Sequence, residues 1–396
     1  MDATQYNTNW STLFLAKKIK NIKLNQYVQS TSVFLLGLLF IKLLATLGAV
    51  FIYAKVTPFN DADHYYLNTS LATFGSPPFR TAFTIYLFWG LKYLLHYNLL
   101  VHGVVSMAVG LALWFVIKPE YEYVNKKLLY ACLCLPHFLI WTGVVGKEAL
   151  AIIGFLFIIR ACIDLVVWHE TRMTLLSVGL FLALIERPHF TIAYICLVSV
   201  SFVVAFKKEK LVSHSSVNKS LALFLLCTML FFALSFLLLP VYGEYLLHFM
   251  AKVHHYFSIF PDAKTTRTAI AWSKPDDFFA NLPWGVPVSI IGPTWLEALK
   301  RAILLPVFVE GCIAFFLLMI SCWLLVKTCK KYNQYRTLII WGFLPALVIG
   351  LLMNYPFGIF NIGSMLRYKQ SLAPLLYLYP VLLIGAIEKR NAKIRL

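Results

Sequence analysis

The sequence predicts an all-α protein of the membrane, a polytopic bundle of about ten transmembrane helices in one domain, residues 1–396. Three observations predict this fold class. Hydrophobic residues make up 60% of the chain and charged residues only 13%, and the mean hydropathy is +0.75, which is more apolar surface than a soluble core of this length can bury. Apolar runs able to cross a layer of ~30 Å recur along the chain. Lysine and arginine gather between alternate runs.

Each expected span is an apolar run bounded by polar or basic residues. The spans cover residues 33–56, 98–117, 128–144, 149–168, 174–186, 189–206, 220–241, 303–326, 337–355 and 370–387. The fifth is the shortest, and the tenth is followed by a basic tail, residues 388–396.

The charge distribution sets the expected orientation. The first apolar run is too long for the core of a cleavable signal peptide, so it is expected to act as an anchor behind an interfacial cytoplasmic segment, residues 1–31. More than half of the 35 lysines and arginines then fall in short cytoplasmic segments if both termini lie inside. The net charge of +18 therefore encodes orientation and does not indicate a nucleic-acid partner.

Two external loops are expected to be large, residues 57–97 and 242–302. The stretch from 81 to 97 is apolar enough to resemble a span, but Pro77, Pro78, Arg80 and Lys92 in and before it favour a helix on the membrane surface.

The first external loop carries the candidate catalytic residues, Asp61 and Asp63, with His64 beside them as a candidate for substrate binding. Two carboxylates next to a membrane are costly, which favours a functional role. One of them is suited to accept a proton from an attacking hydroxyl. Two other interpretations stay open: an N-cap for a helix that starts near His64, and a Mg²⁺ or Mn²⁺ ion bridging a diphosphate.

Basic residues on the same face are candidates for binding phosphate, because arginine meets phosphate oxygens in pairs and lysine supplies a compact charge. Lys147, with Glu148 as its neighbour, lies between the third and fourth spans, and Arg187 lies between the fifth and sixth. Arg367 and Lys369 open the last span. Three of these residues also have a structural interpretation. Lys147 can act as a membrane anchor, Glu148 as a favourable charge at a helix start, and Arg187 as a member of a local ion pair.

Other charged residues have more open roles. Arg267, in the second large loop, is a further candidate for binding a phosphate or a sugar carboxylate. Glu310 is expected to pair with a basic residue of the outer face. Arg160 and Asp164 are four residues apart, so they share one helix face and can neutralise each other; Lys42 is a possible third member, and such internal charges also occur in transporters.

The order of these features resembles the multi-spanning glycosyltransferases of the GT-C class and the related bacterial polysaccharide polymerases of the O-antigen type. The resemblance rests on residues 60–66 (NDADHYY), 135–150 (LPHFLIWTGVVGKEAL) and 365–374 (MLRYKQSLAP). It implies that the key acid is Asp61 or Asp63 and that the active face lies outside the cytoplasm of a bacterial inner membrane. The chain has no Trp-Trp-Asp motif of the kind that oligosaccharyltransferases carry.

These observations predict a membrane glycosyltransferase or polysaccharide polymerase. Its donor would be a sugar on a polyprenyl phosphate or diphosphate and its acceptor a glycan or lipid, with no organic cofactor required. The alternative is a flippase or transporter of lipid-linked oligosaccharide, which would use the same basic residues for binding. An acyltransferase of surface sugars is a weaker alternative, because the sequence shows no convincing pairing of histidine with aspartate or serine.

Overall fold

The computed structural model describes residues 8–55, 65, 79–206, 216–258, 266–267 and 272–395, with side chains from residue 28 onward except those of residues 80 and 256–258. Over these ranges the chain is helical and has no β-strand; an isolated β-bridge joins Thr266 to Asn361. The predicted all-helical fold is therefore confirmed over the described part of the chain.

The α-helices are α1 (Thr8–Phe51), α4 (Phe79–Leu95), α5 (Asn98–Ile117), α6 (Lys126–Leu133), α7 (Pro136–Trp141), α8 (Lys147–Ile163), α9 (Met173–Glu186), α10 (Pro188–Phe206), α11 (Val217–Leu237), α12 (Leu239–Ser258), α13 (Asp277–Ile291), α14 (Trp295–Lys300), α15 (Leu305–Lys331), α16 (Leu344–Phe360), α17 (Ile362–Tyr368) and α18 (Tyr379–Arg395). Short 3₁₀ or π segments are η1 (Tyr53–Lys55), η2 (Lys118–Glu120), η3 (Asp164–Trp168), η4 (Ala302–Leu304), η5 (Asn333–Tyr335), η6 (Leu338–Phe343), η7 (Lys369–Leu372) and η8 (Pro374–Leu378).

Seven helical segments of the described chain are long and apolar enough to cross a membrane, or up to eight if the bent pair Ile362–Leu372 and Pro374–Arg395 forms one span. They are Val28–Lys55, Asn98–Glu120, Lys147–Trp168, Pro188–Phe206, Val217–Leu237, Ala302–Lys331 and Asn333–Phe360. These helices support a multi-pass membrane protein.

Two of the predicted spans take a different form. The span expected at 174–186 is the apolar helix α9, which has only 14 residues. The span expected at 128–144 is divided into α6 and α7, with 8 and 6 residues. The division comes directly before Pro136, as expected because proline disfavours the helical conformation in the residue that precedes it.

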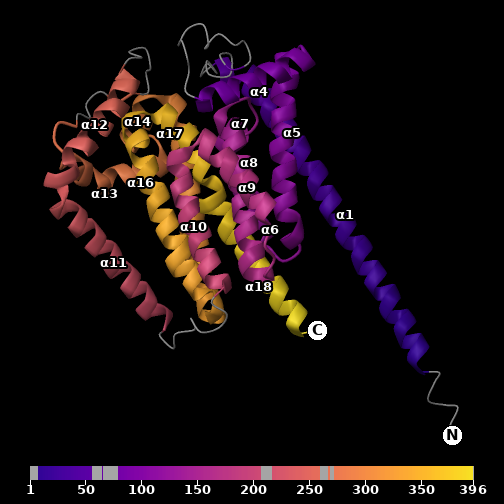
Figure 1. Cartoon of the computed structure of the whole chain (residues 1–396). Coiled ribbons are helices and arrows are strands. Elements are labelled where there is room, and N and C mark those ends of the chain that lie inside the picture. The colour runs from indigo at the N-terminus through magenta and orange to yellow at the C-terminus, as the bar shows by residue number, and fades with distance from the viewer. Residues whose placement is uncertain are drawn as a thin grey trace.

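Both ends of the bundle can be recognised from its contacts and from Figure 1. α4 lies across one end, the end at which α7, α14 and α17 also lie (Figure 1). α8 and α9 run between the two ends: Lys147 and Glu186 contact α4, whereas Asp164 and Arg172 pair at the opposite end. The N-terminal part of α1 continues in one helix with the first span and projects beyond the bundle (Figure 1).

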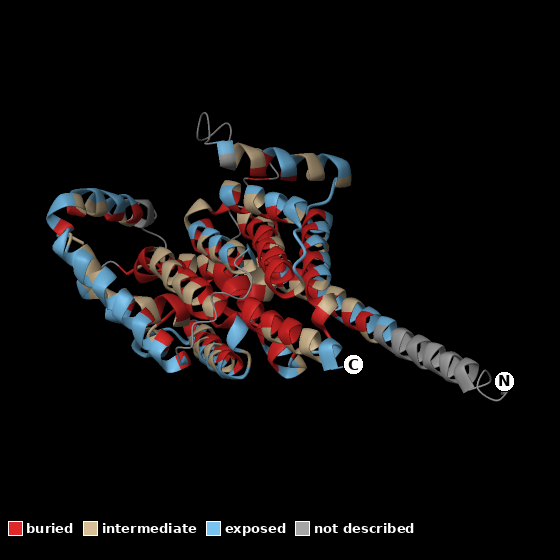
Figure 2. Cartoon of the chain, turned by 60° about the horizontal axis from the view of Figure 1, so that its bottom comes forward, coloured by how far each residue is buried: buried red, intermediate tan, exposed pale blue. Residues whose placement is uncertain are grey.

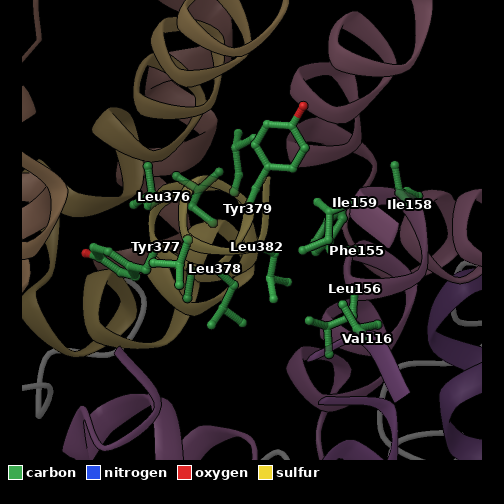
Figure 3. Packing of buried hydrophobic residues seen from close by; sticks show 14 of the residues in the cluster. Val116, Phe155, Leu156, Ile158, Ile159, Leu376, Tyr377, Leu378, Tyr379 and Leu382 are labelled. Carbon is green, nitrogen blue, oxygen red and sulfur yellow. The ribbon is translucent and has the colours of Figure 1, made fainter. Parts of the chain in front are cut away.

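The core is built around α8, and Figure 2 shows the buried residues gathered in the centre of the bundle. Phe155 and Ile159 of α8 lie opposite Leu376, Tyr379 and Leu382 from the C-terminal segment (Figure 3). The other side of α8 packs closely on α9. A Cβ atom added to Gly154 would lie 2.8 Å from the carbonyl oxygen of Gly179, so both glycines permit the close approach of the two backbones, as small residues do in membrane helices.

Candidate functional site

The candidate site is a group of buried charges at the end of the bundle that α4 covers. Its centre is Glu148, in the first turn of α8, where the helix dipole favours an acid. The Glu148 side chain is 1% exposed, and its Oε1 accepts a hydrogen bond of 2.6 Å from Arg367 Nε. The same oxygen forms an ion pair with the guanidinium of Arg187. One buried carboxylate therefore holds two guanidinium groups.

The two guanidiniums come from distant parts of the chain and rest on aromatic rings. Arg187, between α9 and α10, has its Cζ atom 4.4 Å from the centre of the Tyr368 ring. Arg367, at the end of α17, has its Cζ atom 5.6 Å from the Trp141 ring. The Arg367 side chain is 18% exposed and that of Arg187 is 7% exposed, so Arg367 forms the more open side of the cluster. Nε of Arg187 is buried and donates no hydrogen bond to the described residues.

α4 is held to this end by polar contacts with the same elements. Lys147 Nζ donates to Thr81 Oγ1 at 2.8 Å, and Thr84 Oγ1 lies 2.9 and 3.1 Å from the two carboxylate oxygens of Glu186. The ammonium of Lys147 also lies 5.8 Å from the ring centre of Tyr65. Glu186, the neighbour with which the sequence suggested a local ion pair for Arg187, therefore binds Thr84 of α4. Arg187 pairs instead with Glu148, in another helix.

A second polar group lies next to the first and was not predicted as a pair. The backbone N–H of His137 donates to Glu310 Oε1 at 3.0 Å, and Nδ1 of the same histidine contacts Oε2. Glu310 therefore contacts a histidine, whereas the sequence predicted a basic residue of the outer face as its partner without naming one. Lys369 is buried and donates to the carbonyl of Ile290 at 3.3 Å.

The two groups are joined through α7. His137 and Trp141 are four residues apart on this helix and therefore share a face, and the Tyr53 ring contacts both, with centres 6.2 and 6.3 Å away. The spacing of the histidine and the tryptophan within residues 135–150 could have predicted that they share a helix face, but neither residue was assigned a role from the sequence.

Arg267 lies apart from this cluster, and its own contacts use its donors. It forms two hydrogen bonds with Glu297, at 2.6 and 2.8 Å, and donates to the carbonyls of Gly292, Gly358 and Ile359. Nε, Nη1 and Nη2 are all engaged in these bonds. This geometry favours a structural role, in which Arg267 joins α14 to the ends of α13 and α16.

The candidate residues Asp61, Asp63 and His64 lie outside the described residues. The described residues that flank them are on the candidate site. Tyr53 contacts His137 and Trp141, and Tyr65 is buried beside Lys147.

Comparisons with known proteins give no relative. No protein-family model, curated protein or solved structure matches this chain. The resemblance to GT-C glycosyltransferases and polysaccharide polymerases therefore rests on the sequence motifs alone, and function has to be argued from the geometry of the site.

The charges inside the bundle form a separate group at the opposite end. Arg160 pairs with Asp164, as the spacing predicted, and also with Glu120, and all three are buried. Arg172 adds a second cation to Asp164 at 2.9 Å. Lys42 does not join this group, because its ammonium donates to Thr142 Oγ1 at 2.5 Å near the candidate site. No group of three or more His, Cys, Asp or Glu residues in the described part of the chain is arranged to bind a metal ion.

Proposed function

We propose that the chain is a membrane glycosyltransferase or polysaccharide polymerase that uses a polyprenyl phosphate or diphosphate sugar at the extracytoplasmic face. The observation that carries this proposal is the cluster of Glu148, Arg187 and Arg367 at one end of an apolar bundle. A site with more guanidinium than carboxylate charge in an apolar bundle suits an anionic headgroup on a long hydrocarbon chain.

In the proposed reaction, an acceptor hydroxyl attacks the anomeric carbon of the donor sugar. Arg367 and Arg187 stabilise the negative charge that develops on the departing phosphate. Lys147 and Lys369 add positive charge nearby, and Glu148 holds the two guanidiniums in place. The lipid phosphate is the leaving group, so the reaction needs no organic cofactor; Mg²⁺ or Mn²⁺ is compatible with the carboxylates of Asp61 and Asp63, one of which is the base that the sequence predicts.

The proposed topology has ten crossings, both termini in the cytoplasm, and the candidate site outside. α9 and the pair α6–α7 would then be short crossings, in addition to the eight longer ones. The positive-inside distribution of lysine and arginine supports this orientation. The expected membrane is the bacterial inner membrane, and the partners are the lipid-linked donor, a glycan or lipid acceptor, and membrane lipid.

The test is glycosidic bond formation in proteoliposomes that contain only this protein, a set of polyprenyl-linked sugars and candidate acceptors. We expect Arg367→Gln and Arg187→Gln to raise the KM for donor at least tenfold and to lower kcat. Arg301→Gln is the matched control, since Arg301 is exposed at the same end of the bundle; it should retain wild-type kinetics.

Two outcomes would contradict the proposal. If the wild-type protein forms no bond with any donor but moves donors between leaflets, the chain is a lipid-linked oligosaccharide transporter. If Arg367→Gln and Arg187→Gln react like the control, the guanidinium cluster does not bind the headgroup.

A further inference from the structure

The buried pair of His137 and Glu310 has the geometry of a group that accepts a proton. A carboxylate can only accept hydrogen bonds, so Nδ1 of His137 carries the hydrogen in its contact with Glu310, and Nε2 of the neutral ring is left as an acceptor. Nε2 is buried and makes no hydrogen bond with the described residues. A histidine oriented by a carboxylate through Nδ1 is the arrangement that serves as a general base in other enzymes.

The pair is fixed in place by the elements around it. Glu310 lies in α15, next to Gly311, and a Cβ atom at Gly311 would overlap the carbonyl of Ile291. α13 and α15 therefore touch at this point and leave Glu310 little freedom. The second hydrogen bond, from the His137 backbone N–H to Glu310 at 3.0 Å, also fixes the carboxylate relative to α7.

The charged and titratable groups that face the pair come from every neighbouring element. Lys369 of η7 is close enough to Glu310 to attract its charge, and Tyr377 of η8 is close enough to be influenced by it. The Tyr53 ring of η1 stands edge-on to His137. The pair is therefore surrounded by a cation, a phenol and an aromatic ring from three different elements.

His137 is also next to the place where a phosphate would be bound. It lies one helical turn before Trp141, on the same face of α7, and the guanidinium of Arg367 rests on the Trp141 ring. A donor whose phosphate contacts Arg367 would therefore be bound beside α7.

We propose that His137, oriented by Glu310, is the base that removes the proton from the acceptor hydroxyl; this inference rests on the proposed function. The hydroxyl oxygen forms a bond to the anomeric carbon, and the bond from that carbon to the phosphate oxygen breaks, with its electron pair staying on the phosphate. The proton of the hydroxyl moves to Nε2 of His137 and later to water. The base is then a histidine of the bundle and not Asp61 or Asp63.

The experiment compares His137→Gln, Glu310→Gln, Asp61→Asn and Asp63→Asn in the proteoliposome assay across pH, with His248→Gln as control. His248 is an exposed histidine of α12 in the external region. We expect His137→Gln to lower kcat by about 100-fold or more, as loss of a general base does, with the KM for donor within threefold of wild type. The acidic limb of the wild-type kcat profile should be absent from the residual activity.

Glu310→Gln provides a second test if His137→Gln does not accumulate in the membrane, because the amide oxygen can still accept one of the two hydrogen bonds that His137 makes to Glu310. Loss of the carboxylate removes the negative charge that balances a protonated ring, so the acidic limb of the kcat profile should move to lower pH; a purely structural role would lower the amount of protein without moving the limb. An unchanged limb in Glu310→Gln overturns the inference. The inference is also overturned if His137→Gln keeps a kcat near that of the wild type while Asp61→Asn or Asp63→Asn is inactive. If the wild type itself forms no glycosidic bond, the proposed function fails instead.

Discussion

At the scale of single residues, Glu148 is the side chain on which the candidate site depends most. It is 1% exposed and is the shared partner of two guanidiniums. Removal of one member of a buried ion pair leaves charge uncompensated and costs about 3–5 kcal/mol. We therefore expect Glu148→Ala to destabilise the folded protein by roughly this amount, measured as a large drop in the thermal midpoint of the purified protein in detergent.

Glu170→Ala is the matched control for that change. Glu170 also pairs with an arginine, Arg172, but its side chain is 59% exposed, and exposed pairs contribute only about 0–1 kcal/mol. Its thermal midpoint should stay close to that of the wild type. Equal midpoints for the two variants would show that Glu148 does not hold the two guanidiniums in the folded state.

Single residues also show what the sequence can and cannot predict. The pair of Arg160 and Asp164 was predictable because both lie on one helix, four residues apart. The cluster around Glu148 was predictable only as a set of candidates on one face, since Arg367 is 219 positions away in the chain. Pairings between distant helices depend on how the bundle packs, which local spacing does not determine.

At the scale of helices, the contact between α8 and α9 should be the least tolerant of added volume. A Cβ atom at Gly154 would lie 2.8 Å from the Gly179 carbonyl and 3.0 Å from the backbone nitrogen of Ala183. Those atoms are backbone and cannot turn away, so the helices must separate. We expect Gly154→Val to cost about 1–3 kcal/mol, as overpacking typically does, and to lower the thermal midpoint in detergent.

Gly103 of α5 offers a comparison within the same fold. No atom lies within 4 Å of a Cβ built at Gly103, and alanine favours a helix over glycine by about 1 kcal/mol. Gly103→Ala should therefore leave the midpoint unchanged or raise it. If Gly154→Val also left the thermal midpoint unchanged, α8 and α9 would not be in the close backbone contact described above.

The contacts of the short helix α14 predict that the stability of the folded protein depends on pH. Glu297 forms a capping box with Thr294 and two hydrogen bonds with Arg267. Burial raises the pKa of Glu297, but the bonds from Arg267 and from the Thr294 N–H together outweigh it, so the pKa lies below its ordinary value of 4.5. A depressed pKa means that the carboxylate contributes stability in full above the unfolded value and loses it as pH falls through the folded value.

We therefore expect the thermal midpoint of the wild type to fall on acidification from about pH 5 to about pH 3 more steeply than that of Glu297→Gln. The glutamine variant should be less stable near neutral pH and should approach the wild type in acid. If the thermal midpoints of the two proteins fall in parallel as the pH is lowered, ionisation of Glu297 does not stabilise the folded protein.

The helices also show which features of the fold hydropathy can predict and which it cannot. Apolar runs predicted α5, α8, α10, α11 and α15 because length and composition are properties of one segment. The division of α6 from α7 was missed, although Pro136 was visible in the sequence, because an apolar run was taken as one continuous helix. That division has a structural consequence: it begins α7 at Pro136 and places the following residue, His137, beside Glu310.

At the scale of the whole molecule, the proposed function requires that the candidate site and the basic tail face opposite sides of the membrane. This can be tested with single cysteines, introduced after the eight native cysteines are replaced, and labelled by a reagent that does not cross the membrane. If α6–α7 crosses, Lys127→Cys and Glu170→Cys lie on one side together with Lys393→Cys, and Lys300→Cys lies on the other. We expect labelling of only Lys300→Cys in intact cells and of all four in permeabilised cells, since all four positions are exposed.

If α6–α7 turns back instead, Lys127→Cys and Glu170→Cys will label from opposite sides. Because α8 would then cross in the reverse direction, that result would remove Lys147 and Glu148 from the extracytoplasmic face and with them the proposed donor site.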